Sequence, residues 1–255
     1  MSLVAACCNT PPTKAHWHDK GAEVPLSTKI DGEERLTYRT GPKDSKRGLI
    51  AIYDIFGTHP TTRQFFDRIA EANGGFQLSA PLFFKNGGIS EEDFRNNVMS
   101  WIHANGDYEK NHLGEIIRAA VEDLRRDGCT TFSIFGQCWG ALMAVKAASE
   151  EGTPFLSAGG PHPSFVNAET VKDVKAPLVL LPSKDEPDMI PVIESVKHKN
   201  FPVESFHQRF DTMHHGWTGG RGDWEVPEQY NAGLEAVELL AGYFGKVAGV
   251  AESKL

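Results

Sequence analysis

A cysteine near the middle of the chain has the sequence surroundings of a catalytic nucleophile. Cys138 lies at the centre of a Gly-x-Cys-x-Gly pattern at residues 136–140. Residues 130–135 predict a buried strand and residues 141–148 predict a helix, so the pattern falls on a sharp strand-to-helix turn, a nucleophile elbow. Such a turn exposes the side chain of its central residue for covalent catalysis. The sequence therefore predicts a thiol nucleophile; the alternative is an inert buried cysteine in an ordinary turn.

Two later loops supply an acid and a base. Asp185 follows a predicted strand, and His215 precedes the final helix. An imidazole beside a thiol can accept its proton, and a carboxylate fixes the tautomer of the ring. We prefer Asp185 to Asp188 because it lies closer to the strand end. We prefer His215 to His214 because Gly216 follows it and allows the backbone to turn tightly.

A metal site is the competing interpretation of the adjacent histidines His214 and His215. Adjacent side chains point in different directions in most backbone conformations, and no H-x-x-x-H spacing accompanies them. The chain also lacks paired C-x-x-C spacing among its four cysteines. We therefore predict no metal and no cofactor. His162 leaves another predicted strand and is a candidate for the wall of the pocket.

Strands that alternate with helices predict an α/β fold with a mostly parallel sheet and helices on both faces. We expect an irregular leader at residues 1–33 packed on a single domain at residues 34–248, and a flexible tail at residues 249–255. The strands are expected at residues 34–40 (an edge strand), 48–54, 76–80, 130–135, 155–159, 177–181 and 203–206. The helices are expected at residues 62–73, after a capping box at 90–93, and at 113–126, 141–148, 190–199 and 227–245.

Composition excludes several classes of function. The chain of 255 residues has 34 acidic and 26 basic residues, a net charge of −8, and no basic cluster that would bind nucleic acid. No apolar run reaches the length of a membrane span, and the first residues lack the features of a secretory signal. We expect a soluble intracellular protein whose partner is a small molecule. The sequence leaves its oligomeric state open.

These motifs together resemble the dienelactone hydrolase family. The resemblance rests on Tyr-Asp-Ile-Phe-Gly at residues 53–57, on the cysteine elbow, and on Asp185 and His215 in that order. It extends over residues 34–245 and is nearer to the eukaryotic, particularly fungal, branch than to the bacterial enzymes. The resemblance implies the α/β-hydrolase fold.

The resemblance also implies roles for individual residues. The expected reaction is hydrolysis of a lactone, ester or thioester through an acyl-enzyme on Cys138. His215 would be the acid/base and Asp185 would orient it, as a Cys-His-Asp triad. The backbone N–H groups of Ile55 and Trp139 would form the oxyanion hole.

Two further expectations concern the pocket. Bacterial members carry a glutamate that takes part in activating the thiol; Asp54 stands there and is one methylene shorter, so it would tune the nucleophile or, alternatively, only bond the loop backbone. Phe83, Phe84 and Lys85 occupy a strand exit comparable to that of the family's substrate-anchoring arginines. Phe83, Phe84, Trp139 and Trp217 would make a more apolar pocket, and Lys85 would be a further substrate-binding residue.

Two other functions fit the same scaffold: a non-hydrolytic lyase, isomerase or cyclase of a biosynthetic pathway, and a non-catalytic ligand-binding homologue. The final residues, Ser253, Lys254 and Leu255, match the address that the peroxisomal import receptor reads. We therefore predict a peroxisomal location, otherwise a cytoplasmic one, and a substrate from acyl-CoA or secondary metabolism.

Overall fold

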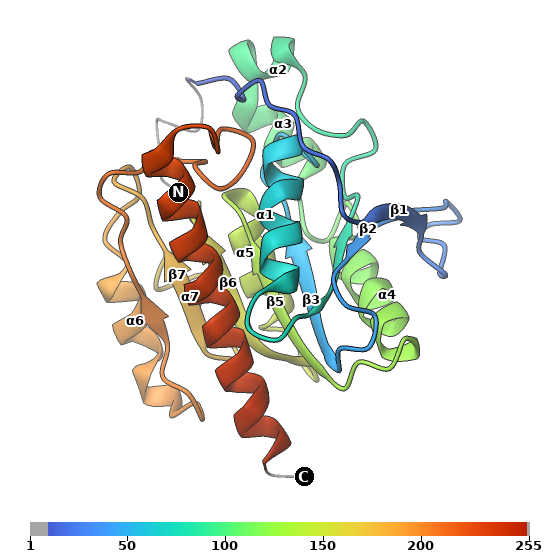
Figure 1. Ribbon diagram of the computed structural model, residues 1–255, viewed down its shortest axis with the longest axis vertical. Coiled ribbons are helices and arrows are strands. Elements are labelled where there is room, and N and C mark those ends of the chain that lie inside the picture. Colours follow the sequence, from blue (N-terminus) through green and yellow to red (C-terminus); the bar gives the residue numbers. More distant parts are fainter. Residues whose placement is uncertain (1–9, 254–255) are drawn as a thin grey trace.

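A computed structural model describes residues 10–253, in which an eight-stranded mixed sheet lies between two layers of helices (Figure 1). The strand order is β1-β2-β4-β3-β5-β6-β7-β8. The first two pairings, β1 with β2 and β2 with β4, are antiparallel, and the remaining pairings are parallel. The strands are β1 (Ala22–Pro25), β2 (Leu36–Thr40), β3 (Arg47–Ile52), β4 (Gln77–Pro81), β5 (Thr131–Gly136), β6 (Phe155–Pro161), β7 (Leu178–Leu181) and β8 (Phe206–His207).

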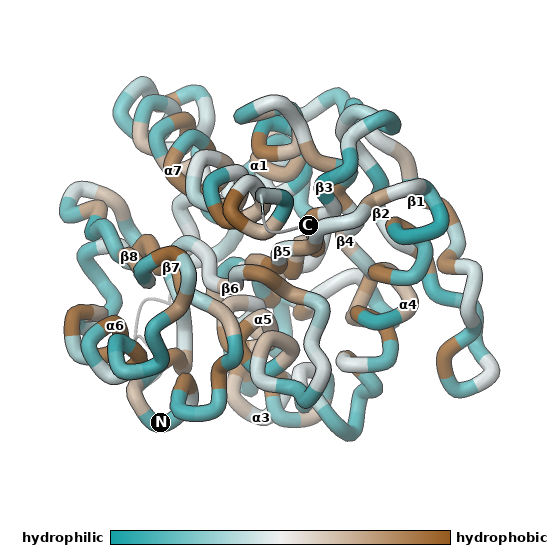
Figure 2. Tube along the Cα trace, turned by 90° about the horizontal axis from the view of Figure 1, so that it is seen from below, coloured by the Kyte–Doolittle hydropathy of each residue, from teal (hydrophilic) through white to brown (hydrophobic). Residues whose placement is uncertain are grey.

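The helices cover both faces of the sheet. Seen from below, α1 and α7 lie on one side of the strands, and α3, α4, α5 and α6 lie on the other (Figure 2). Their bounds are α1 (Pro60–Glu71), α2 (Glu91–Asn96), α3 (Val98–Asn105), α4 (Leu113–Arg126), α5 (Trp139–Ala147), α6 (Ile190–Val196) and α7 (Pro227–Glu252). This arrangement confirms the expected α/β class with a mostly parallel sheet.

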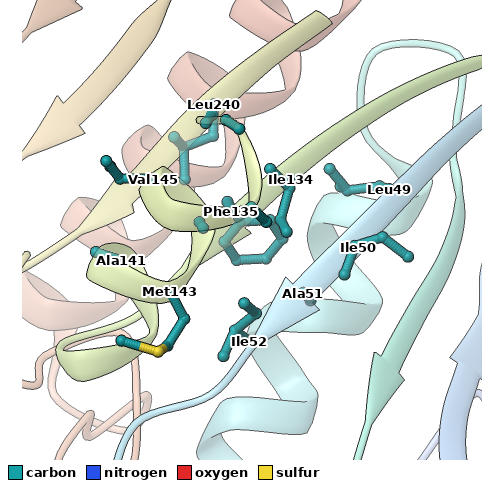
Figure 3. Packing of buried hydrophobic residues seen from close by; sticks show 14 of the residues in the cluster. Leu49, Ile50, Ala51, Ile52, Ile134, Phe135, Ala141, Met143, Val145 and Leu240 are labelled. Atoms are coloured by element: carbon teal, nitrogen blue, oxygen red, sulfur yellow. The ribbon is translucent and has the colours of Figure 1, made fainter. Parts of the chain in front are cut away.

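The central strands are buried on both faces, as their continuous apolar runs require. In β5 the ring of Phe135 contacts Phe66 of α1 at 5.8 Å and Phe244 of α7 at 6.2 Å, which docks both helices on the sheet. Leu49 to Ile52 of β3 and Met143 of α5 fill the same core (Figure 3). Ile52 pairs with Gly136, so β3 and β5 end at the same level of the sheet. The loops that follow these two strands therefore meet.

The structure corrects the expectation of an irregular leader and a β2 edge. Residues Ala22–Pro25 form β1 and pair with β2, so β2 lies one strand inside the edge. All four residues of β1 are exposed, and a segment of four residues is too short for its periodicity to identify a strand. Helix α4 has the bounds that its periodicity predicts, and Ser90 caps α2 by accepting the Asp93 N–H at 3.1 Å.

The C-terminal segment also differs from expectation. Helix α7 continues through residues 249–252, where a flexible tail was expected. Alanine and valine outnumber glycine over these residues, and the helix that precedes them propagates easily. Lys254 and Leu255 lie outside the described residues, and the peroxisomal address stays a prediction. No helix within residues 10–253 is long and apolar enough to cross a membrane.

Candidate active site

The nucleophile elbow is formed as its sequence predicts. Cys138 has φ 55° and ψ −119°, between the end of β5 and the first residue of α5. A positive φ is costly for a non-glycine residue and is typical of strained functional positions. A Cβ at Gly136 would lie 2.0 Å from the carbonyl group of Gly140, and one at Gly140 would lie 2.7 Å from the carbonyl oxygen of Ile52. Both glycines are therefore required for β5, α5 and β3 to pack this closely.

His215 is held between two carboxylates. Its Nδ1 lies 2.6 Å from Oε1 of Glu186, and both side chains are buried, with exposed fractions of 2% and 0%. Its backbone N–H donates to Oδ2 of Asp185 at 2.7 Å. The expectation that Asp185 contacts the imidazole is thus corrected: Glu186 makes this contact, and Asp185 holds the backbone of the same histidine.

The turn after β7 explains why the second carboxylate reaches the ring. The Ser183 N–H donates to the carboxylate of Glu186, and the Asp185 N–H donates to the Ser183 hydroxyl at 3.2 Å. Arg209 donates to the carbonyl oxygens of Ser183 and Glu186, which fixes the turn from outside. With the backbone turned in this way, Glu186 points into the core toward His215. Sequence reasoning missed Glu186, although its position beside Asp185 was the available signal.

The imidazole of His215 also hydrogen-bonds the side chain of Cys138. Burial acts to lower the pKa of His215, but the hydrogen bonds and negative charges of Cys138 and Glu186 together raise it to about 10. Nδ1 faces Glu186, so the ring offers Nε2 to the sulfur. Cysteine, histidine and glutamate thus form one hydrogen-bonded chain inside the protein.

The loop after β6 packs against this chain. The His162 ring lies 5.0 Å from that of His215, edge to face, and its Nε2 is 3.0 Å from Oγ1 of Thr218. Burial and the charge of His215 hold the pKa of His162 well below its usual range. Ser164 lies in the same loop, with its hydroxyl oxygen 3.5 Å from Sγ of Cys138. His162 was a sequence candidate for the pocket, whereas Ser164 was not recognised.

Asp54 is buried at the end of β3, where it bonds backbone groups. Its Oδ1 accepts the Phe56 N–H at 2.9 Å, and its Oδ2 accepts the Gly220 N–H at 2.8 Å. Burial raises the pKa of Asp54. These contacts favour the alternative in which Asp54 bonds the loop backbone, although it also lies at the wall of the pocket beside Cys138.

A narrow pocket opens over the sulfur of Cys138. Its cavity volume is only about 10 Å³, far below the roughly 300–1,000 Å³ of typical small-molecule sites. Arg221 forms part of the wall; its guanidinium lies 5.2 Å from the Phe56 ring, and its Nε donates to the carbonyl oxygen of Thr10 at 2.5 Å. The lining residues are Asp54, Ile55, Phe56, Cys138, His215, Gly216 and Arg221. Sequence reasoning missed Arg221, because only the fold brings the loop before α7 over the elbow.

The aromatic residues expected in the pocket lie elsewhere. Phe83 and Phe84 are each 4% exposed and pack around Tyr53, at ring distances of 5.7 and 5.4 Å. Phe84 also packs on the ring of Trp139 at 5.0 Å. These aromatics therefore support the elbow from within the core instead of lining the pocket.

Lys85 and Trp217 are also absent from the pocket wall. Lys85 is exposed and pairs with Glu33 at 2.7 Å. Trp217 is buried and stacks on Phe210 at 4.6 Å. The surface that faces the pocket is nearly all apolar, but residues other than the expected ones line it.

The two expected oxyanion donors belong to Trp139, the residue after Cys138, and to Ile55, which lines the pocket together with Cys138. Trp139 is the first residue of α5, where a backbone N–H has no carbonyl partner within the helix. Ile55 follows β3 and lines the pocket. No group of three or more His, Cys, Asp or Glu within residues 10–253 could hold a metal ion.

The sheet order and the elbow after β5 define an α/β-hydrolase, and solved structures support this class. A putative dienelactone hydrolase from Klebsiella pneumoniae covers 85% of the chain and is itself covered to 97%, with a TM-score of 0.60 at 16% identity. A dienelactone hydrolase-like promiscuous phosphotriesterase from metagenomic libraries covers 89% of the chain and is itself covered to 98%, with a TM-score of 0.63 at 14% identity. These structures show the shared fold.

Residues 36–206 match the dienelactone hydrolase family, and the chain belongs to this family. An uncharacterized AIM2 family protein of Schizosaccharomyces pombe is 28% identical over 241 residues, covering 87% of the chain and 91% of the relative. Dienlactone hydrolase 1 of Gibberella moniliformis is 27% identical over 197 residues, covering 71% of the chain and 69% of the relative. The predicted family and fold are confirmed, and the chain is a dienelactone hydrolase-like hydrolase.

Proposed function

We propose that the protein hydrolyses a lactone, ester or thioester through an acyl-enzyme on Cys138. His215 is the acid/base, and Glu186 orients its imidazole in place of the Asp185 first expected. The observation that carries the proposal is the buried hydrogen-bonded chain from Cys138 through His215 to Glu186 at a strained elbow. A thiol activated by a neighbouring base, itself oriented by a third group, is the arrangement required for nucleophilic catalysis.

In the first half of the reaction, Sγ of Cys138 attacks the carbonyl carbon of the substrate. The carbonyl oxygen becomes an oxyanion, which the N–H groups of Ile55 and Trp139 stabilise. As the bond to the leaving oxygen or sulfur breaks, Nε2 of His215 gives that atom its proton. The acyl group then remains on Cys138 as a thioester.

In the second half, a water molecule gives a proton to His215 and attacks the thioester carbonyl carbon. The carbon–sulfur bond breaks, Cys138 leaves as the thiolate, and the acyl group leaves as a carboxylic acid. A lactone yields a single hydroxy acid, because its leaving group stays attached to the acyl chain.

Two matched cysteine variants test the proposal. Cys138 and Cys129 are both buried, with exposed fractions of 4% and 2%, but Cys129 lies outside the pocket. Turnover of short aryl esters, lactones and acyl-CoA thioesters should be abolished in Cys138→Ala and retained in Cys129→Ala. Wild-type turnover by a folded Cys138→Ala protein would contradict a thiol mechanism.

The same assay separates the other two functions that fit the scaffold. A lyase, isomerase or cyclase would give a product without the mass of added water. A binding homologue would protect Cys138 from alkylation without any turnover. Hydrolysis instead gives the acid and its leaving group in equal amounts.

A further inference from the structure

The loop at residues 161–165 is rigidly built behind the Cys138–His215 pair. Two prolines flank His162, which has a positive φ of 38°, and Phe165 has a φ of 64°. The His162 N–H donates to the carbonyl oxygen of Leu181 at 2.8 Å. Strained non-glycine residues persist only where the surroundings hold them, and they concentrate at functional sites. The mechanism above assigns this loop no role.

Two contacts connect the loop to the nucleophile. The Ser164 N–H donates to the backbone carbonyl oxygen of Cys138 at 3.0 Å, and the Ser164 hydroxyl oxygen lies 3.5 Å from Cys138 Sγ. Ser164 is only 1% exposed. The backbone bond fixes the register of the two residues, so the hydroxyl stays at the sulfur.

The other partner of the sulfur sets the direction of this hydrogen bond. With Nδ1 of His215 on Glu186, Nε2 faces the sulfur and donates to it when the ring is protonated. The sulfur then has no proton to give, and the serine hydroxyl must be the donor. Hydrogen bonds to an anionic acceptor are about twice as strong as neutral ones.

We propose that Ser164 is a further catalytic residue whose hydroxyl donates a hydrogen bond to the Cys138 thiolate and stabilises the resting thiolate–imidazolium pair. The proposal deepens the proposed function, since it concerns the same nucleophile. In the acyl-enzyme the sulfur is a neutral thioester and accepts more weakly. Ser164 therefore assists deacylation as well, because the leaving sulfur regains its negative charge at the hydroxyl.

The surrounding charged groups are the same with and without this hydroxyl. Asp54 follows β3, Glu186 and Asp185 follow β7, His162 follows β6, and His214 and Arg221 belong to the segment before α7. None of these side chains is altered by removing the Ser164 hydroxyl. A change in thiol titration on its removal therefore reports the lost hydrogen bond.

The test compares Ser164→Ala with a matched control, Ser79→Ala. Ser79 is likewise buried and loses a hydroxyl partner, Thr37 at 2.7 Å, but it lies on β4. Thiolate absorbance against pH, taken as the difference from the Cys138→Ala form of each protein, gives the titration of Cys138. We expect its midpoint to rise by about one pH unit in Ser164→Ala, a tenfold lower thiolate fraction below the midpoint. The Ser79→Ala curve should overlay the wild type.

Iodoacetamide alkylation provides a second readout that distinguishes a catalytic hydroxyl from a structural one. The alkylation rate of Ser164→Ala should fall about tenfold below the midpoint and reach at least the wild-type plateau above it, since a thiolate of higher pKa is the better nucleophile. An unmoved midpoint in the folded variant overturns the proposal, as does a plateau lowered at every pH. Ser164→Gly removes the same hydroxyl and must shift the midpoint in the same direction.

Neither readout uses a substrate. Hydrolysis that survives in Cys138→Ala would contradict the proposed function, but the titration of Cys138 in Ser164→Ala could still be interpreted. Conversely, an unmoved titration would remove Ser164 from the mechanism without affecting the acyl-enzyme.

Discussion

Two adjacent carboxylates, Glu186 and Asp185, bind different parts of His215. Glu186 accepts from the imidazole, and Asp185 accepts from the backbone N–H of the same residue. Only the first contact acts on the charge of the ring. Glu186 is therefore expected to control the protonation of His215, and Asp185 to control the position of its loop.

Exchanging each carboxylate for its amide tests this division. Glu186→Gln should lower kcat by about 1,000-fold or more, a loss like that seen when the acid of a triad is neutralised. Asp185→Asn keeps an oxygen acceptor for the His215 N–H and should cost about tenfold or less. Steady-state kinetics of the two variants beside the wild type measures both effects. Equal losses, or the reverse order, would return the triad role to Asp185.

The pH dependence of activity tests the same difference between Glu186 and Asp185, and the direction of the expected change follows from the pKa of His215. His215 must be protonated to supply the leaving group, and its raised pKa keeps the ring charged up to about pH 10. Activity should therefore fall as the pH rises through about 10. Removing the charge of Glu186 removes one cause of the raised pKa of His215. The loss of activity at high pH should therefore occur at lower pH in Glu186→Gln and at the wild-type pH in Asp185→Asn.

At the residue scale, sequence patterns could identify Cys138 and His215 because each has a diagnostic neighbour, the elbow glycines and Gly216. The acid could not be chosen from the sequence, because the choice depends on how the turn after β7 directs Asp185 and Glu186. The contacts of Ser164 with Cys138 and of Arg221 with the pocket were out of reach for a similar reason. Both depend on loops that only the folded sheet brings together.

At the scale of elements, Asp54 joins the end of β3 to the loop before α7. Its two oxygens accept N–H groups from both segments, and a Cβ at Gly219 would lie 2.3 Å from its Oδ2. Thr61 of α1 holds the same loop by donating to the Gly219 carbonyl oxygen at 2.6 Å. The loop that carries His215 and Arg221 is thus fixed by neighbouring elements.

Asp54→Asn tests whether this carboxylate clamps the loop or tunes the thiol. An amide offers one acceptor where the carboxylate offers two, so one buried N–H loses its partner. We expect a loss of about 1–3 kcal/mol in the free energy of unfolding. The alkylation midpoint of Cys138 should stay in place. Denaturant unfolding and alkylation profiles measure the two effects, and a shifted midpoint with unchanged stability would support tuning instead.

Elements with strong apolar periodicity were predicted with nearly their observed bounds, as for α1, α4 and the central strands. The exposed strand β1 buries too little for a pattern to reveal it, and β8 lies at Phe206–His207, at the end of the strand expected at residues 203–206. Their pairing is decided by neighbours across the sheet. The last residues of α7 likewise continue the preceding helix, where the sequence predicted a flexible tail.

At the scale of the molecule, the N-terminal segment is tied across the domain. Asp67 of α1 is fully buried and accepts from the Trp17 side chain at 2.7 Å and from the Lys20 N–H at 3.0 Å. It also accepts from the Tyr38 hydroxyl at 2.8 Å. Farther along the segment toward the N-terminus, Thr13 donates to the carbonyl oxygens of the loop beside the active site. The segment is therefore expected to contribute to global stability.

Two substitutions on α1 measure that contribution. Asp67→Ala leaves buried donors without a partner and should cost about 3 kcal/mol, which lowers Tm by roughly 6–10 °C in a domain of this size. Glu71→Ala removes only an exposed ion pair with Lys20 and should change stability by less than about 1 kcal/mol. Calorimetry of both variants tests the difference, and similar Tm values would show that the buried carboxylate does not anchor the segment.

The central claim is that Cys138 carries the acyl group during turnover. Rapid acid quenching of the protein with a short aryl ester, followed by intact-mass and peptide analysis, tests this claim most directly. We predict a mass increase equal to the acyl group, confined to the peptide that contains Cys138, absent from Cys138→Ala and longer-lived in Glu186→Gln. Hydrolysis with no acyl mass on any peptide, or with the mass on another residue, would contradict the account.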